Sequence, residues 1–292
     1  VLYMNRSFEE VIEIAKTICD NPDVELWRQY RAKFLSSISL DPKTQAEEKH
    51  NKLQQLLTDI EKLIGHEGSE SDYQLQLLEC EICNEFGKSF LFYKEDSESA
   101  KEYFERALSL NRSPVIANRK GEAIAHGFLG DVWQQKAKLA ESDIDWEKCM
   151  VNAVDSYKNN LDISRETGQD AGILRMTSML GNIELLFAAK DETEQARNIS
   201  INNARSYYEE SSIVAVRTKQ SIGFMFSIIG LIKIELFADT FGEGLELILN
   251  EAIEQKFITD EVFESIEKFI TESTLTLGAN NTELVNSLQR LK

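Results

Sequence analysis

The chain has 292 residues, of which 42% are hydrophobic, and it carries a formal net charge of −18. Binding to phosphate groups depends on clustered lysine and arginine, so this acidic balance argues against nucleic acid or an anionic membrane as the partner. Four cysteines in a chain of this length do not indicate a disulfide framework.

No segment of the sequence is predicted to direct the chain out of the cytoplasm. The N-terminal stretch is typical of an amphipathic helix that contains glutamates, rather than of a basic segment followed by an apolar run. The most apolar stretch, 223–238, contains Lys233 and Glu235 and is too short to span a bilayer. We therefore expect a cytoplasmic protein.

The helix signals are strong along most of the chain. All three prolines lie in the first 114 residues, and a proline inside a helix costs about 3 kcal/mol, so the remainder lacks the commonest helix breaker. Asp96, Asp145 and Asp191 are predicted N-caps, and Thr44-x-x-Glu47 fits a capping box. These signals predict an all-α fold of about thirteen helices.

In chain order, three helices are expected in residues 8–64, before a flexible break near 65–71. Four helical hairpins follow, and they are predicted at 71–110, 116–167, 171–209 and 213–255. The longest insertion is expected at 140–145, between the two helices of the second hairpin. Two further helices are expected to end the chain.

A pattern of small and aromatic residues identifies the first hairpin. Gly87 precedes Phe90 on the first predicted helix, and Ala100, Phe104 and Ala107 recur at i, i+4 and i+7 on the second. Small residues allow two helix backbones to approach closely, and aromatic rings fill the volume beside the crossing. The pattern therefore predicts two antiparallel helices that cross at Gly87.

Weaker copies of this pattern follow along the chain. Leu129-Gly130 leads to Ala153 and Tyr157, Leu180-Gly181 leads to Ala196, and Ile229-Gly230 leads to Gly244 and Ile248. Residues 71–255 thereby resemble the tetratricopeptide repeat (TPR) family. The four glycines, at 87, 130, 181 and 230, lie 43, 51 and 49 residues apart, whereas a standard TPR repeats every ~34 residues, so these copies are stretched and degenerate.

The resemblance implies a fold and an organisation. It implies a right-handed superhelix, or α-solenoid, of antiparallel helix pairs. Residues 1–64 would then be an N-terminal helical portion packed on the array, 71–255 the degenerate repeats, and 256–292 the C-terminal capping helices. Such an array buries its faces only by stacking each repeat on its neighbours, so its members are expected to fold together.

The resemblance also implies a candidate binding site. In TPR arrays the first helix of each hairpin lines a concave surface, and the residues that flank the packed glycine point into it. The corresponding positions here are Asn84, Lys88, Asp131, Gln134, Arg175, Ser178 and Asn182. Such side chains suit the backbone groups of an extended peptide, and Lys88 with Arg175 would clamp a carboxylate. The alternative is that they are ordinary solvated residues.

Other motifs favour structural roles. Cys80-x-x-Cys83 has the spacing of a zinc-ligand pair, but no second pair accompanies it, so core packing is the favoured interpretation. His126 precedes Gly130 by four residues, where a packing residue is expected, and this favours a buried or half-buried structural histidine over a catalytic base. No nucleotide-binding, hydrolase or metalloprotease motif is present. We expect no catalytic residue, metal or cofactor.

The function predicted from the sequence is a non-catalytic scaffold that binds a protein or peptide in the concave groove. One alternative is a sensor or regulatory module of a larger bacterial-type signalling or defence protein that contains an ATPase, a protease or a transcription regulator. The first residue, Val1 rather than Met, is compatible with that alternative. The other alternative is an all-α enzyme, which a deep closed pocket with a perturbed titratable pair would favour.

Overall fold

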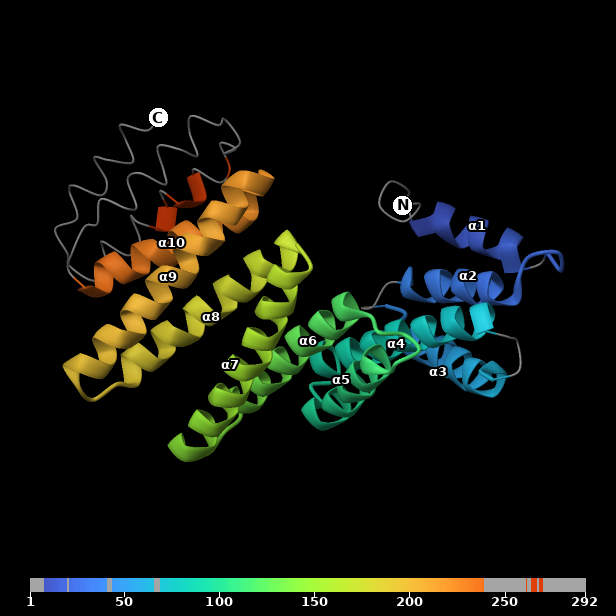
Figure 1. Ribbon diagram of the computed structural model, residues 1–292, viewed down its shortest axis with the longest axis horizontal. Coiled ribbons are helices and arrows are strands. Elements are labelled where there is room, and N and C mark those ends of the chain that lie inside the picture. Colours follow the sequence, from blue (N-terminus) through green and yellow to red (C-terminus); the bar gives the residue numbers. More distant parts are fainter. Residues whose placement is uncertain are drawn as a thin grey trace. The chain divides into compact units, whose positions relative to one another are not determined.

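A computed structural model of the chain describes residues 8–19, 21–40, 44–65 and 69–238, together with 261, 264–266, 268 and 269. The only regular secondary structure in these residues is α-helix, so the chain is all-α as predicted. The helices, labelled in Figure 1, are α1 (Phe8–Cys19), α2 (Leu26–Ile38), α3 (Ala46–Leu63), α4 (Ser69–Phe92), α5 (Ser97–Arg112), α6 (Arg119–Lys138), α7 (Asp143–Glu166), α8 (Asp170–Lys190), α9 (Glu194–Thr218) and α10 (Ser221–Ala238).

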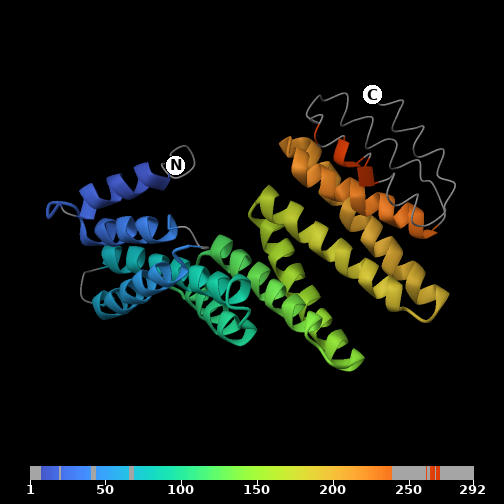
Figure 2. The same cartoon turned by 180° about the vertical axis from the view of Figure 1, so that it is seen from behind.

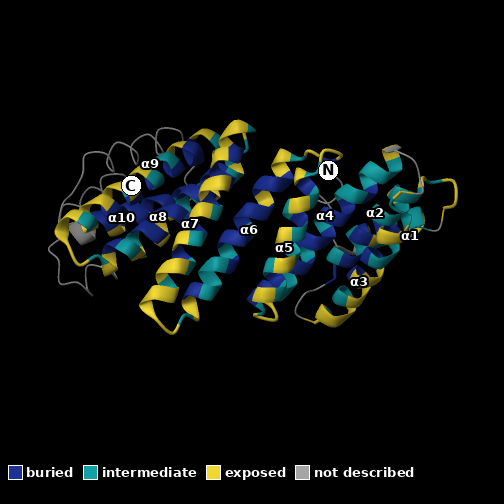
Figure 3. Cartoon of the chain, turned by 60° about the horizontal axis from the view of Figure 1, so that its bottom comes forward, coloured by how far each residue is buried: buried dark blue, intermediate teal, exposed yellow. Residues whose placement is uncertain are grey.

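The chain divides into two compact units, Val1–Ser156 and Tyr157–Lys292, and the boundary falls within α7. The three helices predicted in residues 8–64 are α1, α2 and α3, in the first unit. Apolar residues of α2 and α3 share one core with α4, in which Phe34 and Ile60 pack with Leu75, Ile82 and Phe86. Figure 3 shows buried residues on helix faces that meet neighbouring helices, as expected for amphipathic helices.

The first predicted hairpin is present as α4 and α5, and its crossing is confirmed. A Cβ atom at Gly87 would lie 2.5 Å from Cε1 of Phe104, so no larger residue fits unless the ring moves. Phe104, Ala100 and Ala107 are fully buried, and the Phe104 ring stacks on that of Phe128 at a centroid distance of 4.9 Å. The two helices therefore approach closely at a glycine, with an aromatic ring filling the crossing.

Helices α6 to α10 repeat with a period of 51 residues. The helices α6, α8 and α10 begin at residues 119, 170 and 221, and α7 and α9 begin at 143 and 194. The third residue of each of the helices α6, α8 and α10 is a glycine, namely Gly121, Gly172 and Gly223. Tyr157 and Tyr208 are likewise 51 residues apart, and both are fully buried. The second and third hairpins therefore share their helix spacing and the positions of these glycines and tyrosines.

The predicted insertion at 140–145 is wrong. Only residues 139–142 separate α6 from α7, and α7 begins at Asp143. Most of the length of this hairpin lies in its two helices, because α6 has 20 residues and α7 has 24. The start of α7 is capped by Ser142 rather than by Asp145, whose backbone N–H donates to the Ser142 hydroxyl at 3.1 Å.

The predicted boundary between residues 209 and 213 is also wrong, because α9 runs without a break from Glu194 to Thr218. The serines in this stretch fit a helix, since the Ser212 hydroxyl donates to the backbone carbonyl of Glu209 at 2.8 Å. The helix ends at Lys219, which takes a left-handed conformation with φ of 55°. The first helix of the fourth hairpin, α10, therefore starts at Ser221.

Of the other predicted helix starts, one is confirmed, one needs correction and one stays a prediction. Asp96 caps α5 by accepting a hydrogen bond from the backbone N–H of Ser99 at 3.1 Å, as predicted. Thr193, not Asp191, caps α9. The residue before α3 is Gln45, whose side chain makes no capping hydrogen bond, and the box at Thr44 stays a prediction. Local composition alone did not distinguish a cap from a neighbouring polar residue.

Several predictions fall outside the described residues. Gly244, Ile248 and most of the expected capping helices in 256–292 belong to this part, so the count of about thirteen helices stays a prediction. Within the part that the structure describes, no helix combines the length and the apolar character needed to cross a membrane.

Candidate functional site

The second unit contains a cavity of about 700 Å³ between α8 and α10, which we call the α8–α10 groove. The two helices lie beside each other, with α9 packed against both (Figures 1 and 2). From α8 the groove is lined by Ala171, Arg175, Ser178, Met179 and Asn182, and from α10 by Ile222, Phe226, Ile229, Gly230 and Lys233. Each of these five α10 residues follows one of these five α8 residues by 51 positions. The groove is therefore formed by the same face of two consecutive first helices.

Tyr208 of α9 forms the base of this groove. Its ring is buried and lies against two glycines, because a Cβ atom would come within 2.8 Å of the ring at Gly181 and within 2.3 Å at Gly230. Burial raises the pKa of the Tyr208 phenol, so the hydroxyl stays protonated. It donates a hydrogen bond of 2.8 Å to Oδ1 of Asn182. The amide nitrogen of Asn182 is thereby left as the donor end of that side chain.

A short chain of hydroxyl groups connects the three helices below the groove. The Ser211 hydroxyl of α9 lies 2.9 Å from that of Ser178 on α8 and 2.8 Å from that of Ser227 on α10. Ser211 and Ser227 are fully buried, so these hydrogen bonds satisfy polar groups that would otherwise be costly to bury. They help to fix the register of α8, α9 and α10.

The groove is positively charged within an acidic chain. Arg175, Lys219 and Lys233 line it, and its described lining includes no aspartate or glutamate. The Lys233 ammonium also lies 5.8 Å from the centroid of the Phe269 ring. Because physiological salt screens exposed charges over about 8 Å, a ligand in the groove experiences these cations more strongly than the distant carboxylates of the chain.

Three of the sequence-predicted site residues meet in this groove. Arg175, Ser178 and Asn182 all line it, from one face of α8. Arg175 and Asn182 are exposed, whereas Ser178 is half-buried and its hydroxyl is hydrogen-bonded to Ser211. Arg175 and Asn182 are therefore accessible to a ligand, and Ser178 has a structural contact as well.

The other four predicted residues belong to the first unit. Asn84 and Lys88 lie on α4, and Asp131 and Gln134 lie on α6. Asn84 is buried, and its side-chain oxygen has no hydrogen-bond partner among the described residues. The Lys88 ammonium is paired with Glu85 and lies 5.2 Å from the centroid of the Phe128 ring. The structure thus gives Lys88 an intramolecular counter-ion, and its predicted clamp with Arg175 of the second unit stays a prediction.

Sequence reasoning missed Tyr208, Phe226 and Lys233. It paired Gly181 with Ala196, which is only half-buried near the start of α9 and is not the residue in contact. The overlooked signal is a repeated spacing on the second helix. Ala100, Phe104 and Ala107 of the first hairpin have the same spacing as Ala204, Tyr208 and Ser211 of the third. The helix starts also show that Gly230 corresponds to Met179 rather than to Gly181.

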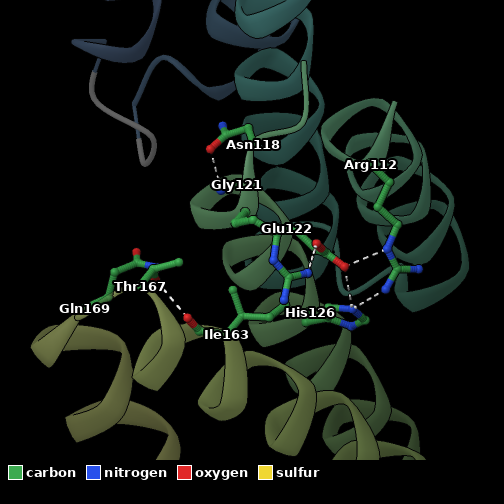
Figure 4. Close-up of polar contacts among 9 residues, drawn as sticks. Arg112, Asn118, Gly121, Glu122, His126, Ile163, Thr167 and Gln169 are labelled. Carbon is green, nitrogen blue, oxygen red and sulfur yellow. Dashed lines mark hydrogen bonds and ion pairs between the residues drawn. The ribbon is translucent and has the colours of Figure 1, made fainter. Parts of the chain in front are cut away.

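A second polar cluster lies in the first unit, around the buried carboxylate of Glu122 (Figure 4). Glu122 accepts hydrogen bonds from Arg119 and, at 2.7 Å, from Arg112. Although burial opposes the charged form, these contacts lower the pKa of Glu122. Arg112 also donates to Nε2 of His126 at 2.9 Å. Burial, reinforced by the Arg112 charge, lowers the pKa of His126, so the imidazole is a neutral acceptor and has a structural role.

We expect the folded protein to lose stability as the pH falls below about 6.5, the ordinary pKa of histidine. Since the pKa of His126 is lower in the folded than in the unfolded state, the unfolded chain binds more protons below that pH. The stabilisation is fully present above pH 6.5 and is lost as the pH decreases. Thermal unfolding at pH 8 and pH 5.5 measures the effect. His126→Gln should reduce the difference in melting temperature, and an unchanged difference would contradict this assignment.

The cysteines of the Cys80-x-x-Cys83 motif are both buried in the core of the first unit, as expected for packing residues. Burial raises the pKa of each thiol to about 12, so both remain protonated. A protonated, inaccessible thiol is a poor nucleophile and a poor metal ligand.

Comparisons with known proteins concern the fold. No family model matches the chain, and a search of curated proteins gives no match. Among solved structures, the chain is similar to the crystal structure of BtubC (BKLC) from P. vanneervenii, with a TM-score of 0.58 and 12% sequence identity. The match covers 86% of this chain and 88% of that one. At this identity the likeness shows that the two chains share an all-helical fold, and no more than that.

Proposed function

We propose that this chain is a non-catalytic scaffold, built as a TPR-like right-handed superhelix, that binds a protein or peptide in the α8–α10 groove. The observation that carries the proposal is the composition of this groove. It combines exposed apolar side chains with cations and a hydrogen-bond donor on equivalent faces of consecutive repeats. The 51-residue period of the helices supports a repeat array, because repeat proteins use such aligned faces as extended binding surfaces.

The exposed apolar residues support a macromolecular partner. Ile222 and Phe226 line the groove with 64% and 57% of their surface exposed, although each is large and apolar. Together with the half-buried Ile229 they form a continuous apolar strip along α10. A partner that covers this strip gains roughly 25 cal/mol for each Å² of apolar surface removed from water. Asn182 then supplies donors for backbone carbonyls of the partner.

The same lining supports a binding role over catalysis. General acid–base catalysis needs a group that gains or loses a proton near neutral pH. The described lining has lysines and an arginine as its charged groups, and it includes no carboxylate, imidazole or thiol. The phenol of Tyr208 is kept protonated by burial and is already engaged with Asn182.

Reversing two charges in the groove should abolish capture of the partner. The double variant Arg175→Glu with Lys233→Glu replaces attraction by repulsion, and both side chains are exposed, so the free energy of unfolding should change by less than about 0.5 kcal/mol for each. The measurement is an affinity pull-down with the immobilised chain, quantified by mass spectrometry, and the wild-type capture should also weaken with added salt.

The matched control is Lys62→Glu with Lys148→Glu. It changes the net charge by the same amount at exposed positions on α3 and α7 that do not line the groove. It should capture the same partners as the wild type. Circular dichroism confirms that each variant is folded. If the folded groove variant and the control retain the same partners, the α8–α10 groove is not the binding site.

A further inference from the structure

We propose that the α8–α10 groove recognises an extended internal peptide segment in which two acidic residues flank an apolar one. This inference rests on the proposed function and specifies its ligand. It follows from three features of the groove: where its cations lie, what separates them, and which hydrogen-bond donor lies beside them.

The cations lie at both ends of the apolar strip. Lys219 precedes Phe226 by seven residues, in the turn between α9 and α10, and Lys233 follows it by seven residues on α10. A helix rises 1.5 Å per residue, so Lys233 lies about 10 Å along the helix axis from Phe226. Arg175 is the α8 counterpart of Phe226 and provides a third cation beside the strip.

This distribution favours two carboxylates over one. A single carboxylate, such as the C-terminus of a peptide, can approach only one end of the strip. The cation at the other end would then form no ion pair with the ligand. Two acidic side chains on either side of an apolar residue pair with Lys219 and Lys233, while the apolar residue lies against Phe226. The described lining has no carboxylate of its own to compete with those of the ligand.

The length of the groove sets the length of the segment. From Ile222 to Lys233 the groove runs eleven residues along α10, or about 16 Å. An extended segment of about five residues spans this length.

Asn182 adds a contact that suits an extended backbone. Its Oδ1 accepts from the Tyr208 hydroxyl, so its amide N–H groups face outward as donors. Backbone carbonyls of an extended peptide lack partners within the peptide itself, whereas those of a helix are already hydrogen-bonded. The inferred ligand therefore has acidic residues three to five positions apart, an apolar residue between them, and no requirement for a free terminus.

Selection from a display library tests this inference with the full chain. The probe is a library of random ten-residue segments, each placed between neutral glycine–serine flanks so that it has no free terminus. Segments that bind the wild type are then counted for binding to Arg175→Glu with Lys233→Glu and to the control Lys62→Glu with Lys148→Glu. We expect enriched segments to carry two acidic residues around an apolar one. These segments should bind the control variant and should not bind the groove variant.

Fluorescence anisotropy with one enriched segment, acetylated and amidated, then measures each part of the motif. Changing both acidic residues to glutamine should weaken binding at least tenfold, and changing the apolar residue to serine should have a similar effect. Proline at a position between these residues should be tolerated, because an extended peptide accepts proline and a helix does not.

The outcomes separate the two proposals. Groove-dependent segments without acidic residues, or segments that proline inactivates, would overturn the inferred ligand while the groove stays the binding site. Absence of any groove-dependent segment would also overturn it, and the pull-down would then decide independently whether the groove binds a partner. If the groove variant retains both the segments and the partners captured by pull-down, both proposals fail.

Discussion

Replacing Tyr208 with alanine is expected to destabilise the protein by about 3–5 kcal/mol, the usual cost of removing a large buried ring. The ring fills the space between Gly181 of α8 and Gly230 of α10. Neither glycine has a side chain that could move into the cavity. The loss is expected to appear in urea unfolding followed by circular dichroism, and the variant should also lose partner capture, since the base of the groove is removed.

The matched control is Tyr208→Phe. It keeps the ring in place and removes only the hydroxyl that donates to Asn182 at 2.8 Å, so we expect a cost of about 0.5–1.5 kcal/mol. The difference between the two variants isolates the contribution of ring packing. If alanine costs no more than phenylalanine, the ring does not hold α8, α9 and α10 together, and the structural basis of the groove is wrong.

The sequence predicted the first hairpin accurately because its contacts are close in the chain. Phe104 follows Gly87 by 17 residues, and only a short turn lies between the two helices. In the second hairpin the sequence paired Gly130 with Tyr157, a separation of 27 residues. The same separation joins Gly181 to Tyr208, the pair that the structure places in contact. Comparing the two hairpins with each other would have revealed this pair.

The third hairpin was misjudged because long amphipathic helices have few internal landmarks. Glu209 and the serines after it are polar enough to suggest a turn, yet the serine hydroxyls bond within the helix and to neighbouring helices. Which of these alternatives a polar residue adopts depends on tertiary contacts. Because α9 was predicted to end at residue 209, Gly230 was aligned with Gly181. The residues of α10 that line the groove were therefore not predicted.

The positive character of the groove could not be read from composition. A net charge of −18 describes the whole chain, whereas Lys219 and Lys233 gather with Arg175 only when α8 and α10 lie side by side. The resemblance to TPR proteins pointed to Arg175 and Asn182, which are exposed on α8. It could not indicate that Lys88 would be paired with Glu85, because that depends on the rotamers chosen in the folded first unit.

The second large loss of stability is expected for substitutions in the first hairpin. Gly87→Leu should be strongly destabilising, because even its Cβ atom would lie 2.5 Å from the Phe104 ring, and overpacking of this kind costs about 1–3 kcal/mol or more. Phe104→Ala should cost about 3–5 kcal/mol, since the ring is fully buried and stacks on Phe128. Both values are measured as free energies of unfolding in urea.

The double variant Gly87→Leu with Phe104→Ala distinguishes this close contact from two independent defects. Leucine at position 87 would occupy part of the volume that the phenylalanine ring leaves, so each change should relieve the other. We therefore expect the double variant to be more stable than the sum of the single variants by more than about 0.5 kcal/mol, the margin within which distant sites behave additively. Simple additivity would show that the two helices do not cross at Gly87, because residues in direct contact at a packed crossing cannot change size independently.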